Sequence, residues 1–211
     1  MGYPDLIAPI EDIPGLEYRA DSDAICARHG LRPRRIPDAE SYFSLMGCEL
    51  HVYDIVKERG CERLCDLNEP LLVEKQYDIV LDVGTVEHVI NIWQALVNIA
   101  SLVKLGGHVL HENPFNWGNH GFYNLNPTFY ADFYGQNGFE MIECKLVDRN
   151  GNSVVVPLTG RFRWEGKEMN MFAMARRIKI QEFVYPTQSK YKKLFADAGL
   201  AGEEEKEIAH G

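Results

Sequence analysis

The clearest pattern of apolar and polar residues lies in the middle of the chain. Ile79-Val80-Leu81 is a continuous apolar run, typical of a strand buried on both faces, and a turn with an acid and a glycine follows it. Apolar residues then recur at helical spacing from 92 to 103, with Asn91 as the N-cap and Gln94 three residues later. His108 to His111 begins a second strand. The pattern predicts a strand–helix–strand unit with a polar cleft at the carboxyl end of its first strand.

The flanking segments predict further short elements of both kinds. Helices are expected over 23–29, 40–46, 128–137 and 190–195, and strands over 50–53, 138–143, 154–156 and 170–175. We see no internal repeat and no second domain. The prediction is one domain over 1–211, with an irregular segment over 1–38, a core over 39–180 and a flexible tail over 203–211.

Composition and charge narrow the classes of partner. The 211 residues are 45% hydrophobic and carry a net charge of −9, which disfavours binding to nucleic acid. No apolar run approaches the ~20 residues of a membrane span. The five cysteines, an odd number without a recognisable signal peptide, indicate reduced thiols. We therefore predict a cytoplasmic protein that binds no nucleic acid, no membrane and no metal, since no cysteine pair has zinc-site spacing.

Three runs stand in a fixed order within the central unit. They are Tyr77-Asp78-Ile79-Val80, Val86-Glu87-His88-Val89 and Leu102-Val103-Lys104-Leu105-Gly106-Gly107. In this order and spacing they resemble the second half of class I methyltransferases, which use S-adenosylmethionine. The resemblance implies an α/β fold of the Rossmann-like class I methyltransferase type, a sandwich whose sheet is mostly parallel with an antiparallel last strand. It also implies S-adenosylmethionine as the cofactor and methyl transfer as the reaction.

The resemblance assigns contacts to the cofactor. Asp54, after the second strand of the family pattern, would accept hydrogen bonds from both ribose hydroxyls. Asp66, beside Leu67, would accept a hydrogen bond from the amino group of the adenine. The remaining residues expected near the cofactor's methionine moiety are Asp82, Val83 and Gly84. Two plainer interpretations stay open: Asp54 caps the turn that follows it, and Asp66 belongs to an ordinary turn before a proline.

The glycine-rich turn of the family, G-x-G-x-G, is not found in this sequence. The nearest candidate is Gly2-Tyr3-Pro4-Asp5, which would be such a turn without the strand before it, and Gly2 is its expected cofactor contact. A trimmed chain, a degenerate site and a different segment in the central position all stay open as explanations. The missing turn supports an alternative function, a non-catalytic methyltransferase-like binding or scaffold protein that has lost affinity for the cofactor.

The segment 111–127 is dense in Asn, His and aromatic residues and follows the second predicted strand. We expect it to overhang the same sheet edge as Asp82, where loops of α/β folds recognise their substrates. The predicted substrate-binding residues are Asn113, Asn116, Trp117, His120 and Tyr123. The alternative is a structured loop whose Asn side chains bond its own backbone.

The same region supplies the catalytic candidates. A general base helps methyl transfer to a hydroxyl, and His120 is the first candidate for it and His88 the second. Glu87 would orient either histidine. The acceptor that we expect is a small molecule or sugar-like compound. A homo-oligomer that uses the segment 160–166 stays open.

Overall fold

The computed structural model describes residues 1–7, 13–57, 59–158 and 160–197. The flexible tail predicted over 203–211 lies outside these residues. The chain forms two compact units, Met1–Leu67 and Asn68–Gly211. Among the described residues, no helix has the length and apolar character needed to cross a membrane.

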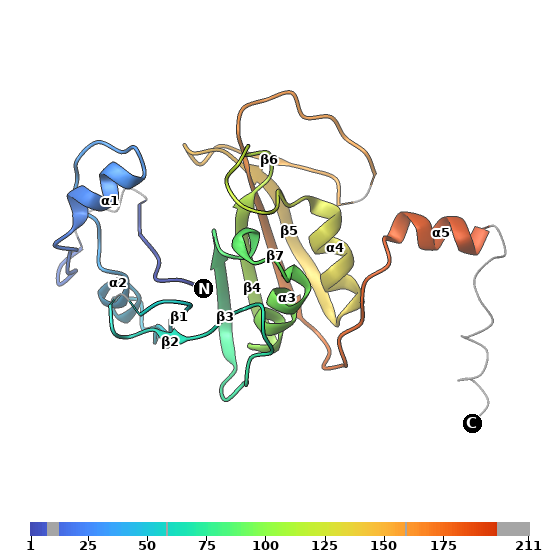
Figure 1. The fold of residues 1–211 in the computed structure, drawn as a ribbon, viewed down its shortest axis with the longest axis horizontal. Coiled ribbons are helices and arrows are strands. Elements are labelled where there is room, and N and C mark those ends of the chain that lie inside the picture. The colour runs from blue at the N-terminus through green and yellow to red at the C-terminus, as the bar shows by residue number, and fades with distance from the viewer. Residues whose placement is uncertain (8–12, 58, 159, 198–211) are drawn as a thin grey trace. The chain divides into compact units, whose positions relative to one another are not determined.

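The first unit combines two short helices with a two-stranded parallel sheet (Figure 1). Its elements are α1 Ser22–Arg28, α2 Ala39–Leu45, β1 Tyr53–Asp54 and β2 Arg63–Leu64. Helix α2 begins after its N-cap Asp38, whose side chain accepts a hydrogen bond from the backbone N–H of Ser41. Ile25, Cys26 and Ile36 are buried together and form a small core for this unit.

The second unit is built on a five-stranded sheet. Its elements are β3 Tyr77–Val83, the 3₁₀ turn η1 Val86–His88, α3 Ile92–Ser101, β4 Val103–Pro114, α4 Pro127–Gln136, β5 Phe139–Val147, β6 Ser153–Val155, β7 Asn170–Arg177 and α5 Ser189–Asp197. The predicted cap of α3 is confirmed, because the Asn91 side chain accepts a hydrogen bond from the backbone N–H of Gln94.

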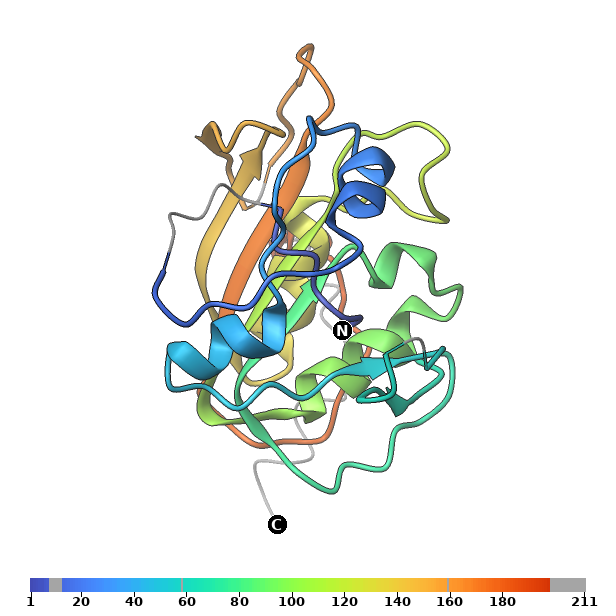
Figure 2. The same cartoon turned by 90° about the vertical axis from the view of Figure 1, so that its left-hand side faces the viewer.

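The strand order β3-β4-β7-β5-β6 corrects the predicted fold class. Only β3 and β4 pair in parallel. Strand β7 lies between β4 and β5 and runs antiparallel to both (Figure 2), and β6 pairs antiparallel with β5. Three of the four neighbouring pairs are therefore antiparallel, and the prediction of a Rossmann-like methyltransferase sandwich with a mostly parallel sheet is wrong. An antiparallel last strand is predicted and β7 is one, but β1 and β2 form a separate two-stranded sheet, which leaves β3 and β4 as the one parallel pair of the five-stranded sheet.

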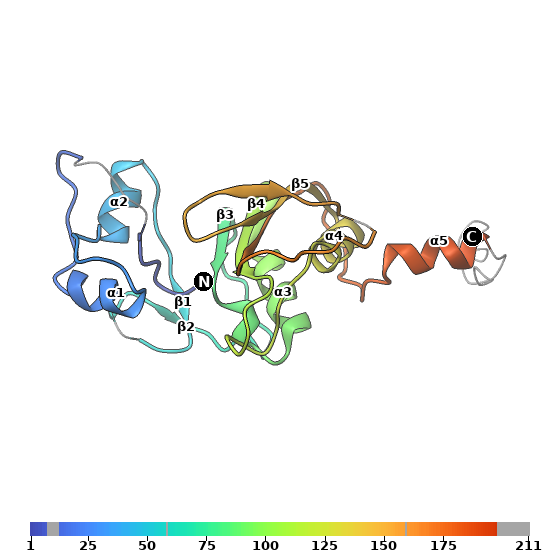
Figure 3. The ribbon, with the colours of Figure 1, turned by 90° about the horizontal axis from the view of Figure 1, so that it is seen from above.

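Helices α3 and α4 cover one face of this sheet (Figure 3). The two helices contact each other through the rings of Trp93 and Phe133, whose centroids are 5.7 Å apart. Strand β4 turns Val109, His111 and Asn113 toward this covered face, where all three are buried. Because alternate residues of a strand point to the same face, two polar side chains lie in core positions beside the end of β3.

Candidate functional site

The site begins where β3 ends and the chain turns into η1. Gly84 adopts a φ of 70°, in the left-handed region that glycine enters without strain, and its N–H donates to the carbonyl of Glu112 on β4. The buried carboxylate of Asp82 then accepts a hydrogen bond from the N–H of Val86, the first residue of η1. These contacts fix the turn that presents Glu87.

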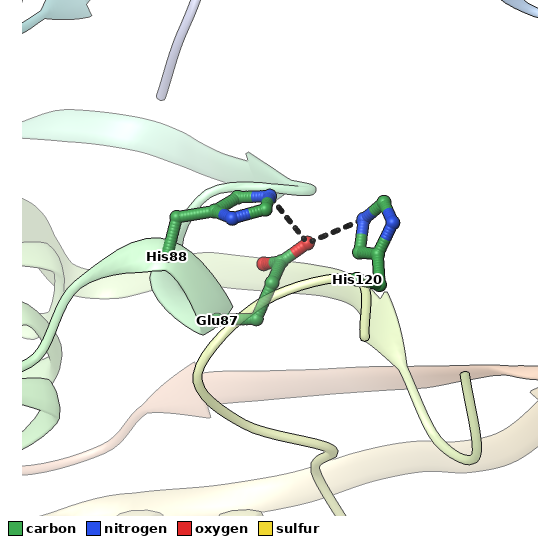
Figure 4. Close-up of side chains that lie close together, drawn as sticks. All are labelled: Glu87, His88 and His120. Atoms are coloured by element: carbon green, nitrogen blue, oxygen red, sulfur yellow. Dashed lines mark ion pairs between the residues drawn. The ribbon is translucent and has the colours of Figure 1, made fainter. Parts of the chain in front are cut away.

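Glu87 has a fully buried side chain with two unlike carboxylate oxygens. Its Oε2 accepts a hydrogen bond of 2.9 Å from Nδ2 of Asn113. Its Oε1 accepts no hydrogen bond among the described residues, and it lies 3.7 Å from Nε2 of His88 and 3.6 Å from Nε2 of His120. Figure 4 shows both imidazoles directed at this one oxygen, His88 from η1 and His120 from the loop after β4. A buried carboxylate oxygen thus faces two histidines that are 49% and 41% exposed.

Main-chain contacts hold the loop of His120 against Glu87. The carbonyl of Glu87 accepts hydrogen bonds from the N–H of Phe122 at 2.7 Å and of Tyr123 at 3.3 Å. Gly121 approaches so closely that a Cβ at this position would lie 2.8 Å from the same carbonyl oxygen. The structure therefore brings together the three residues predicted as catalytic, Glu87, His88 and His120.

A network of buried polar side chains lies beneath this cluster. His111 Nδ1 is 2.6 Å from Asp82 Oδ2, and His111 Nε2 is 2.5 Å from the hydroxyl of Tyr134 on α4. The hydroxyl of Tyr130, one turn earlier, donates to Asn113 Oδ1 at 2.5 Å. Asn113 joins this layer to Glu87, so helix α4 supports the site through hydrogen bonds as well as through packing.

The pKa values of the two buried carboxyl groups, Glu87 and Asp82, are shifted in opposite directions. Burial raises the pKa of Glu87, and the negative charge of Asp82 adds to this effect, while the hydrogen bond from Asn113 opposes it. For Asp82, burial alone would raise the pKa, but the hydrogen bond and the charge of His111 outweigh burial and lower it. Asp82 is thus held as an anion, whereas Glu87 exchanges a proton more readily, a division typical of functional carboxylate pairs.

Two residues of the second unit that are predicted to contact ligands belong to this buried network. Asp82 is predicted to face the cofactor, but its carboxylate is buried and bonded to His111 and to the N–H of Val86. Asn113 is predicted to bind substrate, but it is 1% exposed and bonds Glu87 and Tyr130. Both residues support the site from beneath its surface.

The other cofactor candidates of the second unit are the neighbours Val83 and Gly84. Val83 is 52% exposed, and Gly84 forms the turn into η1. The backbone of this turn is therefore open to solvent next to Glu87.

The remaining predicted cofactor contacts lie on the first unit. The N–H of Gly2 donates to the carbonyl of Tyr53 in β1. Asp54 ends β1, and its Oδ1 accepts a hydrogen bond of 3.2 Å from the N–H of Val56, as in the capping interpretation. Asp66 follows β2 and is exposed, while Leu67 is buried. The two acids therefore follow the carboxyl ends of paired parallel strands.

The loop after β4 satisfies many of its own polar groups. Asn116 bonds the carbonyl of Lys167 and the N–H of Met169, and Trp117 Nε1 donates to the carbonyl of Met169. The hydroxyl of Tyr123 donates to the carbonyl of Ile90. Within the loop, the Asn124 side chain accepts from the N–H of Trp117 and donates to its carbonyl, as in the alternative of a structured loop. His120 remains directed at Glu87.

Sequence reasoning missed His111, Tyr130 and Tyr134 as members of the site. A signal was present, because Val109, His111 and Asn113 alternate along one predicted strand. Two polar residues in register with a core valine indicate a buried polar network. No protein-family model and no curated protein matches this chain. The functional assignment therefore rests on the residues of the site.

Proposed function

We propose that this chain transfers a methyl group from S-adenosylmethionine to a hydroxyl of a small-molecule or sugar-like acceptor. The observation that supports this best is the buried Oε1 of Glu87, which accepts no hydrogen bond from the described residues and faces two exposed imidazoles. This arrangement can accept a proton from a bound hydroxyl at the surface. The three sequence runs that resemble class I methyltransferases support the choice of reaction, since they include Glu87 and His88.

In the proposed reaction, His120 accepts the proton of the acceptor hydroxyl through Nδ1, because its Nε2 is directed at Glu87. The anionic Glu87 stabilises the imidazolium that forms, because its Oε1 lies 3.6 Å away. Nε2 of His88 lies 3.7 Å from the same Oε1, so the negative charge of Glu87 acts on both imidazoles. General-base catalysis of this kind is worth about 10²–10⁴-fold in rate. When bound, S-adenosylmethionine would supply the methyl group from its sulfonium, and the chain's further task is to align the acceptor.

The predicted cofactor residues fit S-adenosylmethionine in part. Asp54 and Asp66 carry carboxylates at the ends of β1 and β2, and such groups can accept hydrogen bonds from ribose hydroxyls or an adenine amino group. Gly84 and Val83 offer an open backbone turn beside Glu87. Asp82 does not fit, because it is buried and bonded within the protein.

The buried state of Asp82 favours a second candidate function, a binding or scaffold protein without catalysis. The carboxylate of Asp82 is bonded to His111, and the Asn116 side chain, predicted to bind the acceptor, bonds backbone groups of Lys167 and Met169. In this alternative, the cluster of Glu87 with two histidines serves recognition rather than proton transfer.

Isothermal titration of the full-length chain with S-adenosylmethionine and S-adenosylhomocysteine separates the two candidates. Methyl transfer requires saturable heat for both ligands, with one site per chain. Circular dichroism recorded on the same sample confirms that the chain is folded. The absence of heat at several hundred micromolar ligand, with a folded chain, would overturn methyl transfer and leave the binding protein.

A further inference from the structure

We propose that Glu87, His88 and His120 bind a divalent first-row transition-metal cation, with Zn²⁺ as the probe. One ligand atom from each side chain lies within 4.8 Å of the other two. The residues come from two separate segments, η1 and the loop after β4, and they converge on one point at the surface (Figure 4). The site does not depend on methyl transfer.

The distances are close to those of a coordinated cation. Nitrogen and oxygen ligands at about 2.0–2.1 Å from a tetrahedral Zn²⁺ lie about 3.3–3.4 Å from one another. Oε1 of Glu87 is 3.6 Å from Nε2 of His120 and 3.7 Å from Nε2 of His88. The ligand nitrogens of the two imidazoles lie within 4.8 Å of each other, so rotation of these exposed rings toward each other would bring three ligand atoms around one cation.

The state of Glu87 is a second and independent sign of a cation. Its side chain is 0% exposed, and Oε1 accepts no hydrogen bond among the described residues. A buried carboxylate oxygen without a partner is costly, because it has lost its hydration and gained nothing in return. The oxygen points at the gap between the two imidazoles, where a cation would bind it and restore the lost interaction.

The surroundings of the cluster resemble those of metal ligands in general. The other oxygen of Glu87 accepts a hydrogen bond from Asn113, which Tyr130 holds in turn. Such outer hydrogen bonds orient a ligating carboxylate and keep its free oxygen in place. His88 and His120 are both exposed, so a cation enters from solvent and retains open positions for water or an acceptor.

The ligand set selects the kind of cation. Two imidazoles with one carboxylate suit Zn²⁺, Fe²⁺, Co²⁺ or Ni²⁺, whereas Mg²⁺ and Ca²⁺ prefer oxygen ligands. With three protein ligands and open positions, the site has the form of a catalytic rather than a structural metal centre. A role for the cation in lowering the pKa of an acceptor hydroxyl rests on the proposed function, whereas the metal site itself does not.

Zinc binding to the full-length chain, purified without a histidine tag, tests the proposal. Equilibrium dialysis followed by metal analysis should give one Zn²⁺ per chain at this site. Calorimetric titration should give a Kd on the order of 1 µM or tighter, weaker than four-ligand structural sites. His88→Ala, His120→Ala and Glu87→Gln should each weaken binding by at least about 100-fold, because even outer partners of metal ligands contribute about 10–100-fold.

Two controls separate this site from other ligands for zinc. His29→Ala removes a histidine of comparable exposure outside the cluster, and it should leave the Kd unchanged. Cys48 and Cys61 carry exposed thiols, so Co²⁺ substitution should be recorded as well. Binding at the cluster gives visible bands without the near-ultraviolet charge transfer of a cobalt–thiolate bond.

Three results would overturn the proposal. They are no Zn²⁺ binding by the folded wild-type chain, an unchanged Kd in the His88 and His120 variants, and Mg²⁺ binding tighter than Zn²⁺. The two histidine variants change exposed side chains, so they keep the test valid if Glu87→Gln fails to fold. Titration with S-adenosylmethionine in metal-free buffer tests the proposed function separately, and either result can fail without the other.

Discussion

Asp82 and His111 face each other across the parallel pair of β3 and β4, with 2.6 Å between Oδ2 and Nδ1. Both side chains are 0% exposed. The same carboxylate accepts a hydrogen bond from the N–H of Val86, which stabilises the turn that carries Glu87. The functional cluster at the surface is therefore positioned by a hydrogen-bonded pair in the core.

Replacing Asp82 should strongly destabilise the second unit. Asp82→Asn keeps the shape of the side chain but removes the charge that pairs with His111. Breaking a buried pair in this way costs about 3–5 kcal/mol, because the remaining partner loses its compensation. The free energy of unfolding from urea titration measures the effect. Asp78→Asn is the control, since Asp78 pairs with Lys104 at the exposed surface and its loss should change stability far less.

The same residue should give the stability a defined dependence on pH. The folded pKa of Asp82 is lowered below its ordinary value of 3.8, since the hydrogen bond and charge of His111 outweigh the effect of burial. The stabilisation is therefore complete above pH 3.8 and is lost as the pH falls through the folded value. Urea titrations at a series of acidic pH values should show this loss in wild type and a smaller one in Asp82→Asn. Equal slopes in both proteins would contradict the assignment.

Tyr130→Phe tests the buried support of Glu87. The variant removes only the hydroxyl that donates to Asn113 Oδ1, and it leaves that oxygen buried without a partner. We expect a loss of about 1–3 kcal/mol in the free energy of unfolding. Tyr123→Phe is the matched control, because the carbonyl of Ile90 that it leaves is near the surface and water can replace the hydroxyl. A larger loss in the control than in Tyr130→Phe would argue against a buried network.

The local features of the fold could be predicted from the sequence, whereas the pairing of strands in its sheets could not. The cap of α3 at Asn91 follows from short-range hydrogen bonding, so the residue type at one position reveals it. Strand direction depends on which strands pair, and β7 pairs with strands formed by residues far from it in the sequence. The apolar pattern of Met171, Ala173 and Ala175 marks a buried strand without stating its neighbours.

The candidate site could likewise be predicted only in part from the sequence. Glu87 and His88 are adjacent in sequence, and placing the loop after β4 at the same sheet edge predicts the proximity of His120. Strand alternation turns Asp82 and Asn113 toward the core, where they bond other buried side chains, and the predicted contacts with ligands did not include this burial. The surroundings of the Glu87 carboxylate depend on distances between η1, strand β4 and the loop after β4. No local sequence pattern contains these distances.

Asn91→Ala should destabilise α3 by removing its N-cap. The side chain accepts the N–H of Gln94 and also donates to the carbonyl of Asn68. We expect a loss of about 0.5–2 kcal/mol, the usual range for an N-cap replaced by alanine. Asn91→Asp should recover most of the lost stability, because a carboxylate accepts a hydrogen bond from the same N–H of Gln94 and its negative charge is favourable at a helix N-terminus. No recovery in Asn91→Asp would show that the contact with Asn68, rather than the cap, stabilises this region.

Gly121→Ala should separate the loop of His120 from Glu87. An added Cβ would lie 2.8 Å from the carbonyl oxygen of Glu87 and 3.0 Å from its Cγ, and both belong to a fixed part of the site. The loop must move to relieve this overlap. We expect a loss of about 1–3 kcal/mol in stability, as for other overpacked positions, measured by urea titration. A lower affinity for Zn²⁺ should accompany it, measured by calorimetry.

Gly118→Ala in the same loop provides the control, since nothing lies within 4 Å of its added Cβ. Its stability should stay within about 0.5 kcal/mol of wild type, as for most surface substitutions. Both variants change the unfolded chain equally, so the difference between them reports the contact with Glu87 alone. Equal stability and equal zinc affinity in the two variants would mean that the loop does not need this close approach. His120 would then be positioned by the hydrogen bonds of Phe122 and Tyr123 alone.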